Sequence, residues 1–351
     1  MIAGIEKDWW TKLVNSVRFL NEIEDQIFDY EKSVILFFDD NVPWQDTMIE
    51  EIETRLSTDS RTVNICDVSE NTKPVGQYLF DRFYPSTKAS DFWRPTHHTY
   101  EQFLATRENL PFNNMFVVVH GIPKDKTKEW FESVNLYLEN CTSEQHAVFI
   151  LIANTASMKT SNYVEPIYYN KYVSDYDCMM LCLTIVSSFN ISRAGKIYLS
   201  EVASGIAKNN VEIAGLLAQS GDALIKDPLT VTRNVYSQNG IQDPHLKENV
   251  DVAVWDAQIR ILFPKIEEYR SGFIKKYMRY IDVELPIENG YGEKITKATD
   301  VEIGLLYYIF RNRSVIAKED LNKLGKMRDM RNRLAHRDSI SYKQLRDLNI
   351  I

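Results

Sequence analysis

The sequence predicts an α/β domain with a parallel sheet, followed by an all-helical C-terminal domain. In the first half of the chain, short apolar runs alternate with helical patterns, which is typical of parallel strands buried on both faces. The last hundred residues contain only helical patterns and the turns between them. At 351 residues, the chain is longer than one domain of common size, so at least two domains are expected.

Four runs of the α/β region are expected to be strands because they are short, apolar and rich in β-branched residues. These runs are residues 33–40, 62–69, 114–122 and 146–154. Helical patterns are found at residues 6–30, 44–57 and 128–141. Alternation of strands and helices predicts a parallel sheet with flanking helices over roughly residues 31–160.

The region after the sheet is expected to form a helical or winged-helix-like extension. Helical patterns lie at residues 175–190, 196–209 and 212–227, and a short strand is expected at 230–237. A winged helix would suggest a DNA-binding adaptor, although this block is not basic. The polar, turn-rich residues 238–250 are expected to be a linker.

The C-terminal region is expected to be a four-helix domain. Its first helix is predicted over residues 252–281, with Pro264 as a kink or break because proline removes a helical hydrogen bond. A loop over 284–299 follows, and then helices at 301–312, 318–336 and 341–350. The predicted domains are therefore residues 1–165, 166–245 and 246–351.

Charge is unevenly distributed along the chain. The net charge of −8 argues against a protein that coats nucleic acid over its whole surface. From Val301 onward, however, eleven Lys and Arg face six Asp and Glu, a local charge of +5. This basic end predicts an anionic partner there, or a helix face that is solvated or pairs with the acidic remainder.

Several features predict a cytoplasmic protein. No apolar run approaches the roughly 18 residues of a membrane helix, and the first residues lack the apolar segment of a secretory signal. The four cysteines form no Cys-x-x-Cys pair, and a disulfide framework would be denser in cysteine, which favours a reducing compartment. These are Cys66, Cys141, Cys178 and Cys182.

A phosphate-binding loop is missing where the α/β region would carry one. Such a loop needs glycines and a lysine, but the first expected strand is followed by DDNVPWQDTM. Asp39 and Asp40 would repel a phosphate, so ATP hydrolysis is not expected. The set of strands resembles the AAA/STAND class of P-loop NTPases in degenerate form, with His120 where the class has acids. The resemblance implies a sensor or regulatory domain.

One motif carries a specific chemical signal. The segment MRDMRNRLAHRD contains Arg331, Asn332 and His336 in the pattern Arg-Asn-x-x-x-His. Asn332 and His336 are four residues apart and share a helix face. Arg331 and His336 are about 140° apart on an ideal helix, so they converge only if the helix ends or bends near His336. Residues 337–339 are typical of such an end.

This motif, at the end of the third helix of a basic helical domain, resembles the HEPN superfamily over about residues 250–351. The resemblance implies a metal-independent endoribonuclease without a cofactor, in which two subunits of a homodimer form one cleft. It implies His336 as general acid/base, Arg331 as ligand of the phosphate and transition state, and Asn332 as orienting group. The RNA backbone is expected to follow Arg328, Arg333 and Arg337.

The chemistry of these side chains suits that activity. An imidazole exchanges protons near neutral pH and can act on an RNA 2′-hydroxyl. A guanidinium binds phosphate through paired hydrogen bonds and stabilises developing negative charge. A related toxin subclass has a tyrosine two residues after the histidine, which a partner nucleotidyltransferase modifies. Here that position is Asp338, so this form of control is not expected.

An alternative remains open at this point. Many HEPN domains are inactive and serve as dimerisation or docking bundles, and here Arg331 could pair with Asp338, Glu267 or Glu268 while His336 caps its helix. The protein would then be a non-catalytic scaffold or interaction protein, with a pseudo-ATPase domain and a HEPN-like dimerisation bundle inside a larger complex. A regulatory protein partner is expected for either function. A regulator fused to a HEPN effector looks like bacterial toxin or antiphage-defence proteins, which is an analogy only.

Overall fold

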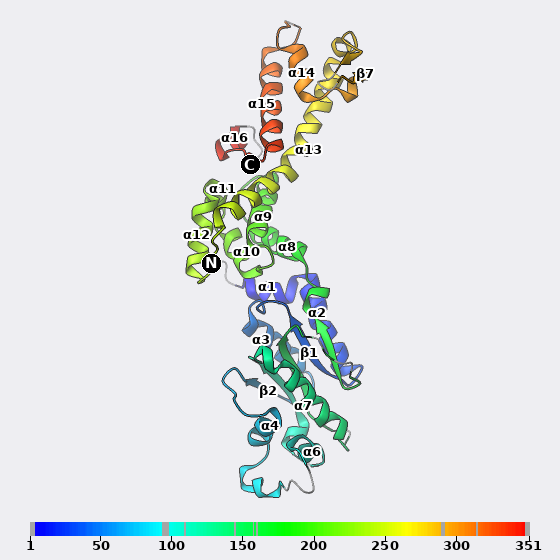
Figure 1. The fold of residues 1–351 in the computed structure, drawn as a ribbon, viewed down its shortest axis with the longest axis vertical. Helices are drawn as coiled ribbons and strands as arrows, with labels where there is room; N and C mark the ends of the chain where they lie inside the picture. The colour runs from blue at the N-terminus through cyan, green and yellow to red at the C-terminus, as the bar shows by residue number, and fades with distance from the viewer. Residues whose placement is uncertain are drawn as a thin grey trace. The chain divides into compact units, whose positions relative to one another are not determined.

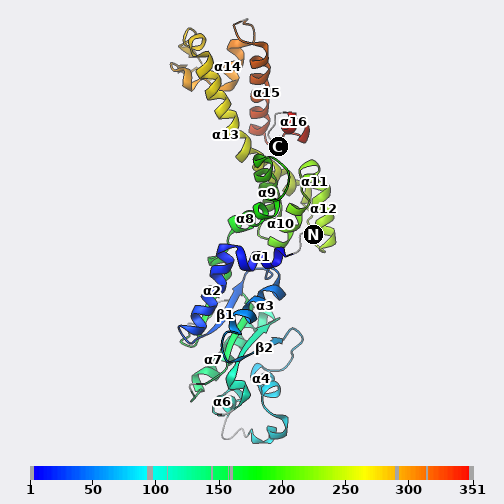
Figure 2. The same cartoon turned by 180° about the vertical axis from the view of Figure 1, so that it is seen from behind.

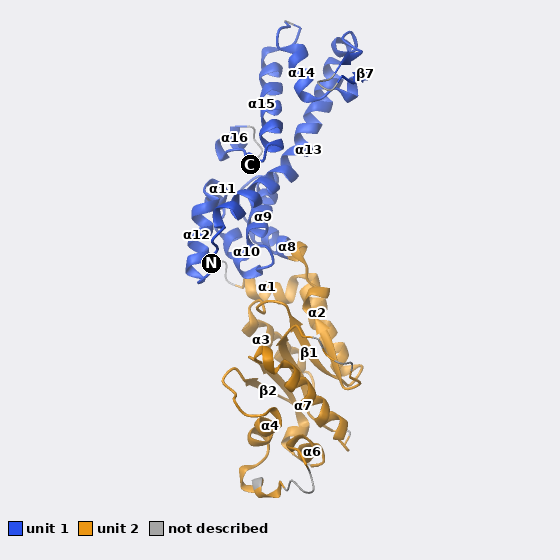
Figure 3. Cartoon of the chain, in the orientation of Figure 1, with its two compact units in different colours: residues 1, 178–351 blue, residues 2–177 orange. Residues whose placement is uncertain are grey.

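The computed structural model describes residues 4–92, 98–108, 110–143, 145–156, 158, 161–288, 292–313 and 315–347. The chain forms two compact units, residues 2–177 and residues 178–351 (Figure 3). The first contains a five-stranded parallel sheet with flanking helices, and the second is a long helical region (Figure 1). The predicted fold class is therefore confirmed. Among the described residues, no helix combines the length and apolar character needed to cross a membrane.

The sheet has the order β2-β3-β4-β1-β5, and all neighbouring strands are parallel. Its strands are β1 Ser33–Phe38, β2 Thr62–Asp67, β3 Met115–His120, β4 Val148–Asn154 and β5 Val164–Tyr168. The four predicted strands are confirmed. The central strands β1, β3 and β4 are almost wholly buried, whereas the edge strand β2 is largely exposed. Their continuous apolar runs reflect helices on both faces.

The helices of this unit form a layer on each face of the sheet. Its helices are α1 Ile5–Lys12, α2 Val14–Phe28, α3 Gln45–Leu56, α4 Val75–Phe83, α6 Tyr100–Ala105 and α7 Thr127–Asn140. Short 3-10 turns lie at Ser86–Asp91, Pro111–Asn114, Lys124–Lys126 and Tyr169–Lys171. Helices α4, α6 and α7 share one buried cluster with Ile35, Val117 and Phe149. On the opposite face, α2 places Phe19 against Phe38.

Two features of this unit differ from the prediction. The single helix expected over residues 6–30 is divided at Leu13, whose backbone is extended (φ −76°, ψ 121°). The strand β5 was not predicted, and the expected domain boundary at 165 falls inside it. Because β5 pairs with β1 along its length, the unit has to extend beyond that boundary. Pro166 weakens the strand pattern, and it is tolerated because β5 is an edge strand.

The second unit is built from a series of helices around the long helix α13. Its helices are α8 Asp175–Val186, α9 Arg193–Ala207, α10 Val211–Gln219, α11 Asp222–Lys226, α12 Pro228–Gln238, α13 Leu246–Asp282, α14 Ile303–Phe310, α15 Lys318–Ala335 and α16 Tyr342–Asp347. Helix α8 begins at the end of the first unit. Between α13 and α14 lie the two-residue strands β6 Ile287–Glu288 and β7 Lys294–Ile295 and a 3-10 turn at Ala298–Asp300. The C-terminal helices that were predicted are thus present.

The strand predicted at residues 230–237 is wrong, because this segment is the helix α12. Asp227 caps the helix by accepting a hydrogen bond from the Thr230 N–H at 3.1 Å, and Pro228 occupies the first turn. These start signals outweigh the β-branched residues of the segment. Residues 178–245 are all described and contain no strand. The winged-helix alternative is therefore wrong, and the DNA-binding adaptor loses its basis.

Helix α13 also differs from the prediction. It begins at Leu246, inside the expected linker, and it continues through Pro264. The residue with non-helical angles is Tyr277 (φ −112°, ψ 17°). Pro264 is exposed, so water can bond the backbone carbonyl that its ring leaves unpaired.

The domain boundary expected at residue 245 is not present, because α13 packs against helices that precede and follow this residue in the chain. This helix contacts α9, α12 and α15, and it runs alongside them (Figures 1 and 2). Arg260 of α13 forms an ion pair with Glu201 of α9 at 3.0 Å. The predicted extension and the predicted C-terminal domain therefore share one compact unit.

Gln258 of α13 is the buried polar link between α9, α13 and the segment after α15. Its Oε1 accepts the Ile340 N–H at 2.6 Å, and its Nε2 donates to the Ile340 carbonyl at 2.9 Å and to the Tyr198 hydroxyl at 3.0 Å. Only 1% of the Gln258 side chain surface is exposed. Burial also raises the pKa of Tyr198 to about 12.

Replacing Gln258 by leucine should destabilise the protein by about 2–3 kcal/mol, because the Ile340 backbone groups and the Tyr198 hydroxyl would be buried without these partners. Urea denaturation measures the change, and amide hydrogen exchange should show faster exchange at Ile340. Gln238→Leu, at the exposed end of α12, is the control. Equal destabilisation by both substitutions would contradict the role assigned to Gln258.

Candidate functional site

Helix α15 ends near His336, as the convergence of Arg331 and His336 requires. The helix ends at Ala335, His336 is its C-cap (φ −95°, ψ 14°), and Arg337 adopts a left-handed backbone (φ 59°). The Arg337 N–H bonds to the Leu334 carbonyl at 3.2 Å, and the Asp338 N–H bonds to the Arg333 carbonyl at 2.9 Å. This is the Schellman pattern, with arginine where glycine is usual. The predicted helix end near His336 is confirmed.

Arg333 holds the turn that follows this helix. Its guanidinium donates to Asp338 Oδ2 at 2.7 Å, to Gln344 Oε1 at 2.9 Å and to the Ser339 carbonyl at 2.6 Å. The hydrogen bond and charge of Arg333 lower the pKa of the Asp338 carboxyl. Arg333, expected to contact RNA, is thus engaged in the fold through three hydrogen bonds.

Arg331 and Asn332 are held together on the last turns of α15. The Arg331 guanidinium bonds to Asn332 Oδ1 and to Glu302 Oε2, both at 3.3 Å. Glu302 is the N-cap residue of α14, and its side chain is 71% exposed. A long, exposed ion pair of this kind is worth about 0–1 kcal/mol, so a phosphate can replace Glu302 at little cost. Among the described residues, the ion-pair partner of Arg331 is thus Glu302, and not Asp338, Glu267 or Glu268 as the alternative expected. Asp338 and Glu267 pair with Arg333 and Arg270 instead.

The His336 imidazole is exposed at the helix end. Within the described part of the chain it forms no hydrogen bond or ion pair, and none joins it to Arg331. The structure thus brings Arg331 and Asn332 together and leaves His336 accessible on the following turn. One copy of the chain does not assemble the three side chains into a bonded cluster.

The two remaining candidate arginines lie on aromatic rings. The Arg328 guanidinium carbon is 3.9 Å from the centre of the Tyr307 ring, and Arg328 also bonds to Asp329 at 2.9 Å. The Arg337 guanidinium carbon is 5.3 Å from the centre of the Trp255 indole. Cation–π contacts hold a guanidinium in place while its edges stay available to other partners.

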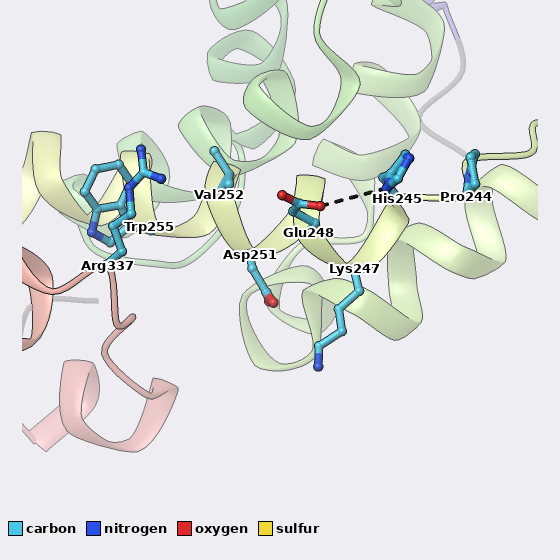
Figure 4. A pocket seen from close by; sticks show the side chains of 8 residues that line it. All are labelled: Pro244, His245, Lys247, Glu248, Asp251, Val252, Trp255 and Arg337. Atoms are coloured by element: carbon cyan, nitrogen blue, oxygen red, sulfur yellow. Dashed lines mark ion pairs between the residues drawn. The ribbon is translucent and has the colours of Figure 1, made fainter.

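Arg337 and Trp255 border a cavity of about 480 Å³ in the second unit (Figure 4). The other lining residues are Pro244, His245, Lys247, Glu248, Asp251 and Val252. The indole is fixed by its Nε1, which donates to the Leu334 carbonyl at 2.8 Å. Sequence reasoning missed this cavity because Trp255 lies 79 residues before Leu334 and carries no local motif.

A second, smaller hollow of about 110 Å³ lies at the carboxyl ends of β1, β3 and β4, lined by Asp40, Asn41, Gln45 and Asn154 among others. Beside it, Asp39 accepts hydrogen bonds from Thr155 at 2.7 Å and Asn170 at 2.6 Å. Ligands of open α/β sheets bind at this edge, where neighbouring strands connect in opposite directions. The hollow is below the roughly 300 Å³ of a usual small-molecule site, and the carboxylate of Asp40 would repel a phosphate.

No protein-family model matches the chain, and the search of curated proteins found no match. The geometry around His336 and the motif itself are therefore the features that bear on function.

The structure predicts that Arg333 and Arg331 contribute differently to stability. Arg333→Ala should lower the melting temperature by a few degrees because the turn after α15 loses three hydrogen bonds, whereas Arg331→Ala should change it little, as expected for an exposed pair. Calorimetry measures both. Similar melting temperatures for the two variants would contradict the structural role of Arg333.

The Arg333–Asp338 contact should also depend on pH. The Asp338 pKa is lowered in the folded state, so the contact stabilises the protein above the unfolded value of about 4. That contribution is lost as the pH falls through the lowered folded pKa. The stability difference between the wild type and Arg333→Ala should therefore narrow below about pH 4, as measured by urea denaturation across pH. A difference that widens on acidification would contradict this.

Proposed function

We propose that the unit of residues 178–351 is a metal-independent endoribonuclease that acts as a homodimer. The observation that carries the proposal is the end of α15, which exposes His336 one turn beyond a weakly paired Arg331. Asn332 bonds to Arg331 and orients it. The basic character of the C-terminal end suits an RNA substrate.

In the proposed reaction, the RNA supplies its own nucleophile. The His336 imidazole takes the proton of a 2′-hydroxyl, and that oxygen attacks the adjacent phosphorus. The bond from phosphorus to the 5′ oxygen breaks, and this oxygen leaves with a proton as a 5′-hydroxyl. The other product carries a 2′,3′-cyclic phosphate. Arg331 leaves Glu302, binds the phosphate and stabilises its charge in the transition state.

A homodimer is part of the proposal because the reaction needs both a base and an acid. Each chain supplies one His336 in the motif. In a pair of copies, one imidazole can take the proton from the 2′-hydroxyl while the other gives a proton to the leaving oxygen. The resemblance to the HEPN superfamily implies such a shared cleft.

The α/β unit is proposed to be regulatory. The hollow at its sheet edge is smaller than a usual small-molecule site and carries Asp40, in keeping with a degenerate NTPase-like domain. By analogy with fused regulators and effectors, the protein would act in the cytoplasm as a toxin or antiphage-defence effector.

A specific observation favours the second candidate, a non-catalytic scaffold. Arg331 of the motif and its neighbour Arg333 both have protein partners, Glu302 and Asp338, so both cations are paired without a ligand. In that case the same surface would serve assembly within a larger complex. Substitutions there would alter assembly and would have no effect on RNA cleavage.

The wild-type protein should cleave single-stranded RNA in EDTA, and His336→Ala should reduce the rate at least a hundredfold, in line with the loss of a general acid/base. Arg331→Ala should have a similar effect through the lost charge stabilisation. A gel assay with total RNA and purified protein measures this.

Lys326→Ala, which removes an exposed cation from the same helix, is the control and should cleave normally. If wild-type protein and both motif variants leave RNA intact while folding and self-association are normal, the scaffold function is supported and the enzymatic one is refuted.

Glu302→Gln should increase RNA affinity, because it removes the carboxylate that competes with phosphate for Arg331. The gain is limited to about fivefold, since an exposed ion pair contributes at most about 1 kcal/mol. Fluorescence anisotropy with a labelled oligonucleotide and His336→Ala protein measures binding without cleavage. A fall in affinity would show that Glu302 supports RNA binding and does not oppose it.

A further inference from the structure

The cavity beside Trp255 is physically joined to the end of α15. The Leu334 carbonyl accepts hydrogen bonds from both the Trp255 indole and the Arg337 N–H. His336 lies between Leu334 and Arg337 in the chain, at the same helix end. A ligand in the cavity would therefore lie against Arg337, the residue that follows His336 in the chain.

Two side chains of the cavity offer planar surfaces for a nucleobase. Figure 4 shows the Trp255 indole and the Arg337 guanidinium next to each other at one end of the cavity. Unpaired RNA bases are bound by stacking on aromatic rings and on guanidinium planes. At about 480 Å³, the cavity is within the range of small-ligand sites and has room for one base with its sugar.

The cavity also contains acceptors. Asp251 lies one helical turn before Trp255, at the spacing that makes side chains neighbours, and among the described residues its carboxylate has no hydrogen bond or ion pair. Glu248 is one turn further and lies 3.9 Å from the His245 ring. A carboxylate accepts two parallel N–H bonds. Guanine has two neighbouring donors, N1–H and the 2-amino group, on one edge, whereas adenine and cytosine have only one amino group there.

We propose that this cavity binds one unpaired guanine of the RNA substrate, stacked against the Trp255–Arg337 pair and hydrogen-bonded to Asp251, beside the bond that is cleaved at His336. This inference rests on the proposed ribonuclease function and gives it a base preference. Lys247 and Arg337 supply positive charge for the adjoining phosphates.

Binding is measured first, with full-length His336→Ala protein and fluorescein-labelled UUGUU, UUAUU and UUIUU, where inosine lacks the 2-amino group. UUGUU should bind about tenfold more tightly than UUAUU, the discrimination typical of a paired hydrogen bond to a base, and UUIUU should lie between them. Asp251→Asn should abolish the preference. Glu268→Gln, the same acid-to-amide change at an exposed position of α13 outside the cavity, should retain it.

Equal affinity for UUGUU and UUAUU, or a preference that survives in Asp251→Asn, would overturn the guanine site. Free GMP is titrated as well, because it carries the same base. Tight binding of GMP without a preference among the oligonucleotides would also overturn the proposal, in favour of a nucleotide-regulated cavity.

Cleavage of the same oligonucleotides by the wild type separates this inference from the function on which it rests. Cleavage of all of them at equal rates would overturn the guanine site and leave the ribonuclease intact. A guanine preference in binding without any cleavage would support the site and refute the ribonuclease.

Discussion

The termination of α15 at His336 is the constraint on which the proposed site depends. Arg337 takes a left-handed conformation that costs an L-residue about 1–2 kcal/mol, and contacts from α13 compensate for it. Trp255 donates to the Leu334 carbonyl, and Gln258 pairs with the backbone of Ile340. Because these bonds fix the chain on both sides of the turn, they determine where the imidazole of His336 is exposed and where the neighbouring cavity opens.

The arginines around this turn have different roles, although the sequence places them close together. Arg333 is bound to three groups of the fold, Arg331 has one long pair with an exposed carboxylate, and Arg337 lies on an indole. The local charge of +5 is therefore not all available to a ligand. Arg331 and Arg337 are the cations best placed to bind RNA. Arg331 lies beside the proposed cleavage site, and Arg337 lies at the cavity.

The features that could be predicted from sequence were those with local causes. The central strands were found because burial on both faces makes them continuously apolar, and the end of α15 was found from residues 337–339. Two elements depart from the average propensities of their residues. The edge strand β5 contains Pro166, and the helix α12 is fixed by its cap, Asp227, despite its β-branched residues. The cavity and the role of Arg333 depend on side-chain contacts that no short motif predicts. At the cavity, the bonded residues Trp255 and Leu334 are 79 positions apart in the chain.

The most direct test of the central claim is the chemistry of the cleaved ends. RNA is incubated with wild-type protein in EDTA, and the ends are identified by mass spectrometry. Attack by the 2′-hydroxyl predicts a 2′,3′-cyclic phosphate and a 5′-hydroxyl, and predicts no cut at a nucleotide whose 2′-hydroxyl is replaced by hydrogen. A 5′-phosphate with a 3′-hydroxyl, or cleavage at the 2′-deoxy position, would show that water is the nucleophile and would contradict the account built on His336 and Arg331.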